Sequence, residues 1–319
     1  MTLRFLSARS YWAAIILTVF LLGFVISIAG ISPAQNNEVV FKKDVRFSDL
    51  PPGIEKRAVP DATPEQIREM LTAQPSIVID GATLYVTAQS AGVGRSLAVR
   101  NLELRNGGRI VTNGINLEVS ALLVSSDKGE ILSFNPEIQH VSGAASDGTS
   151  GQSGLSGGTV VLSGALKDNE ILTVYLPGQD GQAGGRGLVG PDGAPGARGS
   201  NAVDSAFSCA HGGGDGGSGA AGGPGGTGGA GGAGGSGGNV ILRRALASQR
   251  SQMRISAPGG KGGAGGLPGP GGRGGPGGVG GSGSAFCGGG RAGPVGAGGR
   301  EGAPGAKGPN GKNGSIRVD

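Results

Sequence analysis

Two cysteines and a nearby histidine are the side chains of this 319-residue chain whose types and spacing could do chemistry together. Cys209 lies two residues before His211, and Cys287 lies in a second copy of the same local sequence. A zinc site built from these three would need a fourth ligand that the sequence does not suggest. Catalysis by Cys209 with His211 would place both on a Gly-rich segment with no third group to orient them. We therefore expect neither a metal ion nor a catalytic residue.

A disulfide is the chemistry that the two cysteines favour. The chain has an even number of cysteines, and they stand at matching places in a duplicated sequence. Disulfides are typical of exported proteins, because extracytoplasmic compartments are oxidising. We expect a bond between Cys209 and Cys287, with free thiols or intermolecular pairing as the alternatives.

The acidic residues show no spacing that argues for sugar-cleaving chemistry. Those considered are Asp44, Asp49, Glu103, Glu118, Glu130 and Asp180. Enzymes that act on polysaccharides occur among β-helix proteins, so this alternative rests on fold analogy alone. Matches to Gly-x-Gly-x-x-Gly are trivial in so Gly-rich a chain, and none follows a strand into a helix. We expect no cofactor.

Glycine dominates the composition. There are 72 Gly among the 319 residues, aromatic residues make up 4% and charged residues 15%, and the formal net charge is +5. These values lie outside ordinary globular usage and point to collagen-like or low-complexity material. No basic cluster is interleaved with aromatic residues, so we expect no nucleic-acid partner.

Glycine recurs at every third position in four separate runs, numbered in chain order. The first run covers residues 178–199, the second 213–237, the third 260–281 and the fourth 290–314. A three-residue period is that of the polyproline II helix, which makes no internal hydrogen bonds. Such a helix is stable only if its backbone groups find partners on a neighbour, and a glycine edge lets that neighbour approach.

The runs belong to two copies of one unit, which reads strand, glycine run, cysteine-bearing tip, returning run, strand. The first tip has the sequence Ser205-Ala-Phe-Ser-Cys209 and the second Ser284-Ala-Phe-Cys287. We expect two long hairpins, 178–238 and 258–314, whose arms are extended helices rather than β-strands. Residues 141–158 are expected to be a shorter insertion before them.

The runs differ in how much glycine they contain. In the second and third runs nearly every triplet carries Gly twice, whereas the first and fourth usually carry it once. Two glycine edges imply close neighbours on two sides, so we expect the second and third runs inside a four-helix bundle. The glycines expected to pack between the arms include Gly213, Gly216, Gly222, Gly228, Gly263, Gly269 and Gly275.

The tips carry the residues that are expected to make contacts. Phe207, His211 and Phe286 lie beside the cysteines. Exposed aromatic residues mark interfaces, so one hypothesis is a contact surface at the far end of a stalk. The alternative is a small apolar plug over the disulfide. The sequence does not identify the surface or matrix ligand; acidic glycans are one option for the Arg and Lys residues of the runs.

The N-terminal part is typical of an exported protein. Residues 1–34 have a charged start, a long apolar stretch and a small-residue cleavage site, which predicts a signal peptide that is cleaved or kept as a membrane anchor. Residues 35–75 are expected to be linker with a short helix that caps the following strands. This helix begins with Thr63 as its N-cap and ends near Thr72. The remainder is expected to be extracytoplasmic, secreted or at the cell surface, with membrane contact only through the N-terminal segment.

Residues 76–177 are expected to form an all-β base. Short apolar segments of alternating pattern, such as Leu97–Val99 and Leu102–Leu104, are separated by polar or turn residues. A β-solenoid of the right-handed β-helix type has this spacing and tolerates long insertions at its turns, and a small sandwich is the alternative. Residues 239–257 and 315–319 are expected to add strands to the same base.

The Gly-x-y runs, such as Gly190-Pro-Asp-Gly-Ala-Pro-Gly-Ala-Arg-Gly, resemble bacterial collagen-like proteins. The Gly-Gly-x runs are similar to the polyglycine II bundles of phage tail-fibre tip adhesins and related exported Gly-rich proteins. The resemblance is compositional and covers roughly the last 140 residues. It implies a non-enzymatic structural or adhesive protein. A collagen-type trimeric stalk and a β-helix enzyme acting on polysaccharides are the alternatives, and an oligomer stays open.

The substitution Gly228→Val separates the single-chain bundle from the collagen-type trimer. In the bundle, the new side chain disorders an inner arm and leaves the number of subunits unchanged, because the close neighbour is another arm of the same chain. The measurement is the mass in solution of both proteins. A wild-type trimer that dissociates on this change would contradict the single-chain interpretation.

Overall fold

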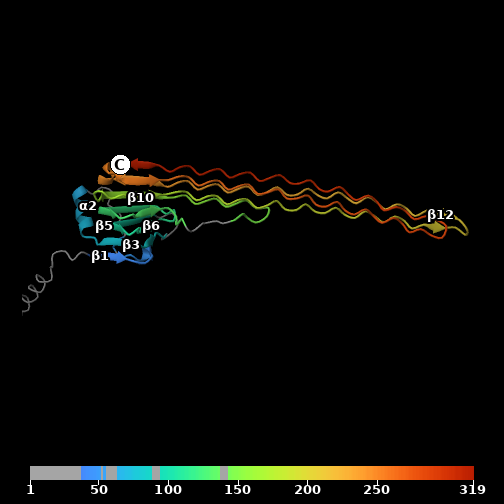
Figure 1. Cartoon of the computed structure of the whole chain (residues 1–319), viewed down its shortest axis with the longest axis horizontal. Helices are drawn as coiled ribbons and strands as arrows, with labels where there is room; N and C mark the ends of the chain where they lie inside the picture. Colours follow the sequence, from blue (N-terminus) through green and yellow to red (C-terminus); the bar gives the residue numbers. More distant parts are fainter. Residues whose placement is uncertain (1–36, 52, 55–62, 88–93, 137–142) are drawn as a thin grey trace, which may run out of the picture.

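The computed structural model describes residues 37–51, 53–54, 63–87, 94–136 and 143–319. The expected export signal, residues 1–34, lies outside the described residues. Figure 1 shows a base rich in β-strands, from which long extended segments run to a distant tip. Strands dominate the base and helices are few, which confirms the expected β-rich class.

The strands of the base belong to two sheets. The first sheet contains β1 (Glu38–Phe41), β3 (Ser76–Asp80), β5 (Arg95–Arg105), β7 (Leu117–Ser126), β9 (Thr159–Leu166), β13 (Asn239–Arg243) and β15 (Ile316–Val318). The second contains β2 (Val45–Arg46), β4 (Thr83–Tyr85), β6 (Arg109–Val111), β8 (Glu130–Leu132), β10 (Leu172–Tyr175) and β14 (Met253–Ser256). Short helical segments are η1 (Phe47–Asp49), α2 (Pro64–Thr72), α3 (Ala245–Ser248) and η2 (Arg250–Gln252).

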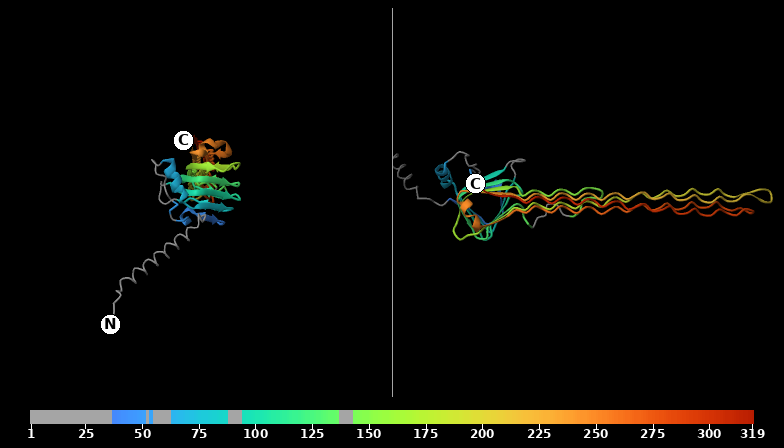
Figure 2. Two further views of the ribbon diagram at one scale, coloured as in Figure 1. Left: turned by 90° about the vertical axis from the view of Figure 1, so that its left-hand side faces the viewer. Right: turned by 90° about the horizontal axis from the view of Figure 1, so that it is seen from above.

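Successive strands alternate between the two sheets. The strand orders are β1-β3-β5-β7-β9-β13-β15 and β14-β10-β8-β6-β4-β2, and neighbours within these two sheets are parallel. Each layer of the base therefore contributes one strand to each sheet. The end-on view of Figure 2 shows the layers stacked in chain order, from blue to orange.

The hydrophobic core lies between the two sheets. Apolar residues at equivalent positions of successive strands are paired in register, as Leu84 is with Ile110 and Ile110 with Ile131. Side chains of this kind are completely buried, among them Ile77, Leu84, Leu102, Leu104, Ile110, Ile131 and Val174. Each additional layer extends these apolar columns, and their burial stabilises the stack.

The first layer corrects the expectation of a linker over residues 35–62. Residues 38–41 and 45–46 form β1 and β2, which pair with β3 and β4. Val39 and Phe41 flank the exposed Val40 and pair with the buried Ile77 and Ile79. Three apolar residues are too short a pattern to stand out in sequence, but an existing sheet edge supplies the partners that make them a strand.

Two strands are longer than expected. The segments Leu97–Val99 and Leu102–Leu104, expected as separate strands, are one strand, β5, and β7 is continuous in the same way. The alternation of buried and exposed residues changes phase near Arg100, which suggested a break. No Gly or Pro interrupts the ladder there, so pairing between β5 and β7 continues on both sides.

The helix expected from Thr63 to Thr72 is confirmed. The Thr63 hydroxyl accepts the N–H of Gln66, and the Gln66 side chain accepts the N–H of Thr63, which completes a capping box. α2 packs against β5 and β7, so it lies beside the stack rather than over its β1 end. A second helical turn, α3, lies between β13 and β14, where only strands were expected.

All long insertions occur at one kind of turn, which leads from a second-sheet strand to the next first-sheet strand. After β6 this connection takes only residues 112–116, whereas after β8 it takes 133–158. After β10 it takes 176–238, and after β14 it takes 257–315. The glycine runs thus leave the base from adjacent layers, which brings them side by side (Figure 1).

Leu102→Ala tests whether the core columns stabilise the base. Leu102 is completely buried and pairs in register with Ile77 and Val124, so the free energy of unfolding should fall by about 2–5 kcal/mol. Val318→Ala, at a position 55% exposed on the last strand, should change it by about 0.5 kcal/mol or less. Urea denaturation of the base, followed by circular dichroism, measures both, and equal losses would argue against this packing.

Candidate functional site

Backbone hydrogen bonds join the glycine runs along their length. In the first run, every third N–H from Gly178 to Gly199 donates to a carbonyl of residues 258–279. N–H groups of the second run donate to the first and fourth runs, those of the third donate to the second, and those of the fourth to the third. The N–O distances between the four runs lie between 2.7 and 3.0 Å, so these are normal hydrogen bonds.

The second and third runs have the most bonded neighbours among the four. The second run bonds to the other three, and so does the third, whereas no backbone bond joins the first run to the fourth within the described chain. Residue numbers rise together in the bonds from the first run to the third, so these runs are parallel. Consecutive runs are antiparallel.

A fifth segment lies alongside the runs near the base, where only four had been expected. Gly151, Gly154 and Gly157 of the short insertion donate to carbonyls of the second run. Gln179 and Gln182 of the first run donate to carbonyls of the insertion. In Figure 1 the insertion ends well short of the tip, while the four runs continue.

The glycines expected to pack between arms do face neighbouring backbone at very short range. At all but one of them an added Cβ would lie 1.9–2.2 Å from a carbonyl oxygen of another run, well inside van der Waals contact. These positions are Gly216, Gly222, Gly228, Gly263, Gly269 and Gly275. At Gly213 the nearest atom would be the nitrogen of Gly290, at 2.7 Å. No side chain fits without separating the runs.

Prolines avoid the positions whose N–H groups bond another run. Gly178, Gly181 and each third residue after them donate to the third run, and no proline occurs in that phase. Pro195, Pro224 and Pro276 lie instead in phases whose N–H groups donate to no carbonyl of another run. Because proline has no N–H to donate, it can stand in these phases without removing a bond between the runs.

Side-chain oxygens supplement the bonds between runs, a feature that sequence reasoning missed. Asp180 and Asp192 of the first run accept the N–H groups of Lys261 and Arg273, at 2.6 and 2.7 Å. Asn201 accepts the N–H of Ser282 in the same way. The sequence signal is that Asp180, Asp192 and Asn201 share one phase of the triplet, which places them on one edge of the helix.

The two tips are joined by the disulfide expected from the sequence. Cys209 and Cys287 are bonded, and their Cα atoms are 4.8 Å apart. β11 (Val203–Asp204) and β12 (Cys209–His211) form a small antiparallel pair at the first tip. The Asp204 carboxylate accepts the N–H groups of Ala285 and Phe286, which holds the second turn against the first.

The phenylalanines of the tip face solvent. Phe207 is 89% exposed and Phe286 is 55% exposed, and His211 is also exposed. A plug over the disulfide would bury both rings, so that alternative is wrong. Each ring occupies the third position of a Ser-Ala-Phe turn, whose first residue bonds the carbonyl of the fourth. The geometry therefore places Phe207, His211 and Phe286 at the far end, exposed to solvent.

The carboxylates considered for sugar-cleaving chemistry lie on different elements, and each has a structural partner. The bonds are Asp44 to the Thr83 N–H, Asp49 to the Arg46 N–H, Glu103 to Arg105, Glu118 to Arg243, Glu130 to Arg109, and Asp180 to the Lys261 N–H. Glu170, which is not one of these six, has a shifted pKa. Burial raises the pKa of Glu170, but hydrogen bonds from Ser126 and Ser125 and the ammonium of Lys167 lower it further, so that the pKa lies below its usual range.

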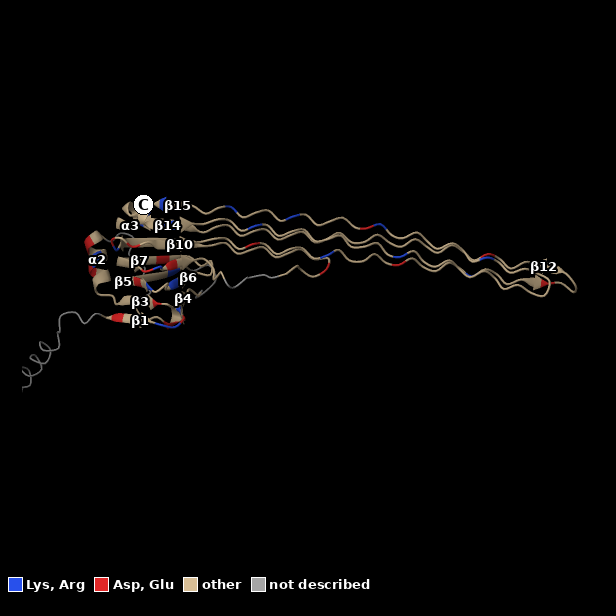
Figure 3. Ribbon diagram, viewed as in Figure 1, with Lys and Arg blue, Asp and Glu red and all other residues tan. Residues whose placement is uncertain are grey.

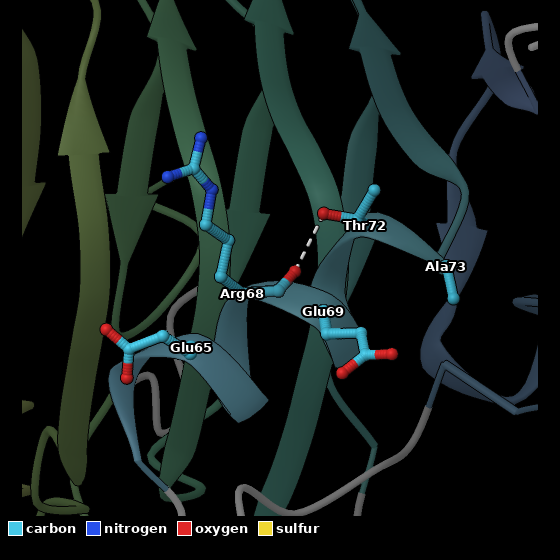
Figure 4. Close-up of a pocket in the computed structure, with 5 residues that line it drawn as sticks. All are labelled: Glu65, Arg68, Glu69, Thr72 and Ala73. Carbon is cyan, nitrogen blue, oxygen red and sulfur yellow. Dashed lines mark hydrogen bonds between the residues drawn. The ribbon is translucent and has the colours of Figure 1, made fainter.

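The surface of α2 has a hollow lined by Glu65, Arg68, Glu69, Thr72 and Ala73 (Figure 4). The Thr72 hydroxyl donates to the carbonyl of Arg68 at 2.7 Å, an ordinary bond within a helix. The acidic side chains there point outward rather than toward one another. In the described part of the chain, no group of three His, Cys, Asp or Glu residues could hold a metal ion.

Charged residues are sparse along the runs and carry both signs. Figure 3 shows isolated blue and red positions between the base and the tip rather than a continuous stripe. Arg186, Arg198 and Arg300 are exposed, as are Asp192 and Glu301. A long anionic polymer would find no row of like charge here, so a solvated surface is the better interpretation of these residues.

Removing the disulfide by Cys209→Ser with Cys287→Ser should loosen the tip and leave the runs paired. Bonds between runs continue up to Gly214 and Gly281, so amide exchange should quicken beyond these residues only. The free energy of unfolding should fall by roughly 2–4 kcal/mol. Hydrogen exchange with mass spectrometry measures the extent. Uniform loosening down to the base would mean that the disulfide, rather than the backbone bonds, holds the bundle.

Among the described residues, no helix is long and apolar enough to cross a membrane. The disulfide is typical of an extracytoplasmic location. No family model matches the chain, and no match was found among the curated proteins or the solved structures. The functional conclusion therefore depends on the base, the runs and the tip themselves.

Proposed function

We propose that this chain is a non-enzymatic, exported structural or adhesive protein. Its base is a β-solenoid, and its glycine runs form a rigid polyglycine II bundle that presents the disulfide-linked tip. The alternation of strands between two parallel sheets supports the solenoid. The three-residue repeat of bonds between extended runs supports polyglycine II.

The single observation that carries this proposal is the uninterrupted row of backbone bonds from the base to the tip. Eight successive bonds run from Gly178 to Gly199 of the first run, and similar rows follow the other runs. Ordering each residue costs roughly 1–2 kcal/mol of conformational entropy, which scattered contacts would not offset. A continuous row gives the backbone groups partners along the whole run, and it makes the stalk stiff over roughly 70–80 Å at about 3.1 Å per residue.

A rigid spacer with an exposed aromatic end suits contact at a distance. The base holds the bulk of the core, whereas the exposed rings of Phe207 and Phe286 lie at the opposite end, beside β12. Their burial against a surface or matrix ligand would stabilise attachment by roughly 1.5–3 kcal/mol for each ring. A glycan is one class of such ligand.

The bonding favours a single-chain bundle over a collagen-type trimer. In a collagen trimer the glycine edge of each chain faces the other two chains. Here the glycine edges of the second and third runs face other runs of the same chain. We propose that the chain is secreted or anchored at the cell surface through residues 1–34, and that the tip projects away from the base.

Hydrogen exchange of the exported protein, with its mass in solution measured alongside, tests this proposal. A monomer should show slow exchange at the bonded glycines of the second and third runs, because their N–H groups donate to neighbouring carbonyls. Glycines 212 and 288 near the tip, which have no such bond, serve as internal controls and should exchange fast. Fast exchange throughout would make the runs flexible spacers and would sink the proposal, as would a trimer.

A further inference from the structure

The short insertion lies in a lane formed by the first and second runs. The first run donates to its carbonyls from Gln179, Gln182 and Gly185, and its own N–H groups donate to second-run carbonyls at residues 230, 233 and 236. The second-run residues that face the insertion form the floor of this lane. A Cβ at Gly229 or Gly232, two of these residues, would lie 1.8–1.9 Å from carbonyl oxygens of the insertion. The lane therefore accepts an extended strand only where its floor is glycine.

The same lane continues toward the tip without an occupant. Beyond the insertion, Leu188, Ala197 and Ser200 of the first run make no hydrogen bond through their N–H groups in the described structure. The floor changes from buried at Gly229 and Gly232 to half-exposed further out. Unpaired groups at this spacing would bond any further strand of Gly-x-y type, as an open sheet edge does.

Two residues interrupt this open part of the lane. Pro191 stands in the phase of Gln179 and Gln182, where an N–H would otherwise donate to an occupant. Ala220 stands in the phase of Gly229 and Gly232, and is the one residue of that phase in the second run that is not glycine. Its methyl group lies where the insertion would bring a carbonyl.

We propose that Pro191 and Ala220 act as a stop that closes a strand-binding lane against extended Gly-x-y segments of other proteins. The stop is local, because Gly226 and Gly223 continue the glycine phase beyond the insertion and only Ala220 departs from it. A second copy of this chain is a poor occupant, since the glycine edges of its inner runs are already filled by its own runs. The partner class that the lane fits is a separate, unpaired Gly-x-y strand. This inference rests on the bundle of the proposed function.

The test uses the full-length chain and a labelled peptide of about fifteen residues that repeats Ser-Gly-Gln, the sequence of residues 150–152 in the natural occupant. The opened variant combines Pro191→Gln with Ala220→Gly, which restores the residue types found under the insertion. The opened variant should bind the peptide at least about tenfold more tightly than the wild-type protein, since a donor is gained and a methyl clash is removed. Binding should slow amide exchange at Leu188 and Ala197.

Matched controls distinguish peptide binding in the lane from binding that follows a general loosening of the runs. The variant Pro304→Gln with Ala292→Gly makes the same two exchanges in an outward phase of the fourth run, away from the lane, and should bind no better than wild type. A peptide that repeats Ser-Ala-Gln should not bind the opened variant, because its Cβ groups would meet first-run carbonyls, as they would at Gly151. Equal binding by the opened and wild-type proteins would overturn the stop. Slow exchange in the inner runs, measured in the same samples, would then leave the proposed function intact.

Discussion

The structure depends on one constraint: the N–H and C=O groups of an extended glycine chain need partners outside their own segment. Polyproline II segments have no internal hydrogen bonds, and glycine has the largest entropy to lose on ordering. The runs meet this constraint with one another, at 2.7–3.0 Å and once per triplet for each bonded pair of runs. The same requirement explains the glycine edges, since a carbonyl can approach only where no Cβ intervenes.

The base decides which runs meet. Parallel strands stack in layers, and adjacent layers release their insertions at the same kind of turn. Runs that leave from successive layers after β10 and β14 are consequently parallel, while the two arms of one hairpin are antiparallel. The hydrophobic core thus sets the register at one end, and the Cys209–Cys287 bond with Asp204 sets it at the other. Between these ends the arms have almost no apolar side chains to bury.

Such a bundle also has open edges, like a β-sheet that does not close. Outward phases of the runs carry proline, charge or bulk, as at Pro195, Arg198 and Val295. Asp180, Asp192 and Asn201 use side-chain oxygens to bond N–H groups that no run reaches. The runs therefore expose prolines, charged groups and isolated aliphatic side chains, and the exposed aromatic rings are found at the tip.

The sequence by itself determined the features that local chemistry dictates. These are the triplet period, the difference in glycine content between runs, the matched cysteines and the capped helix at Thr63. Only the tertiary structure decided which segments become neighbours. Residues 38–41 and 45–46 became strands because β3 and β4 offered them partners, and the short insertion joined the bundle because it leaves from the layer below the first run. The physical reason is that a glycine edge in the sequence indicates only that some neighbour comes close. Which segment that neighbour is, and in which direction it runs, follow from the stacking of the base.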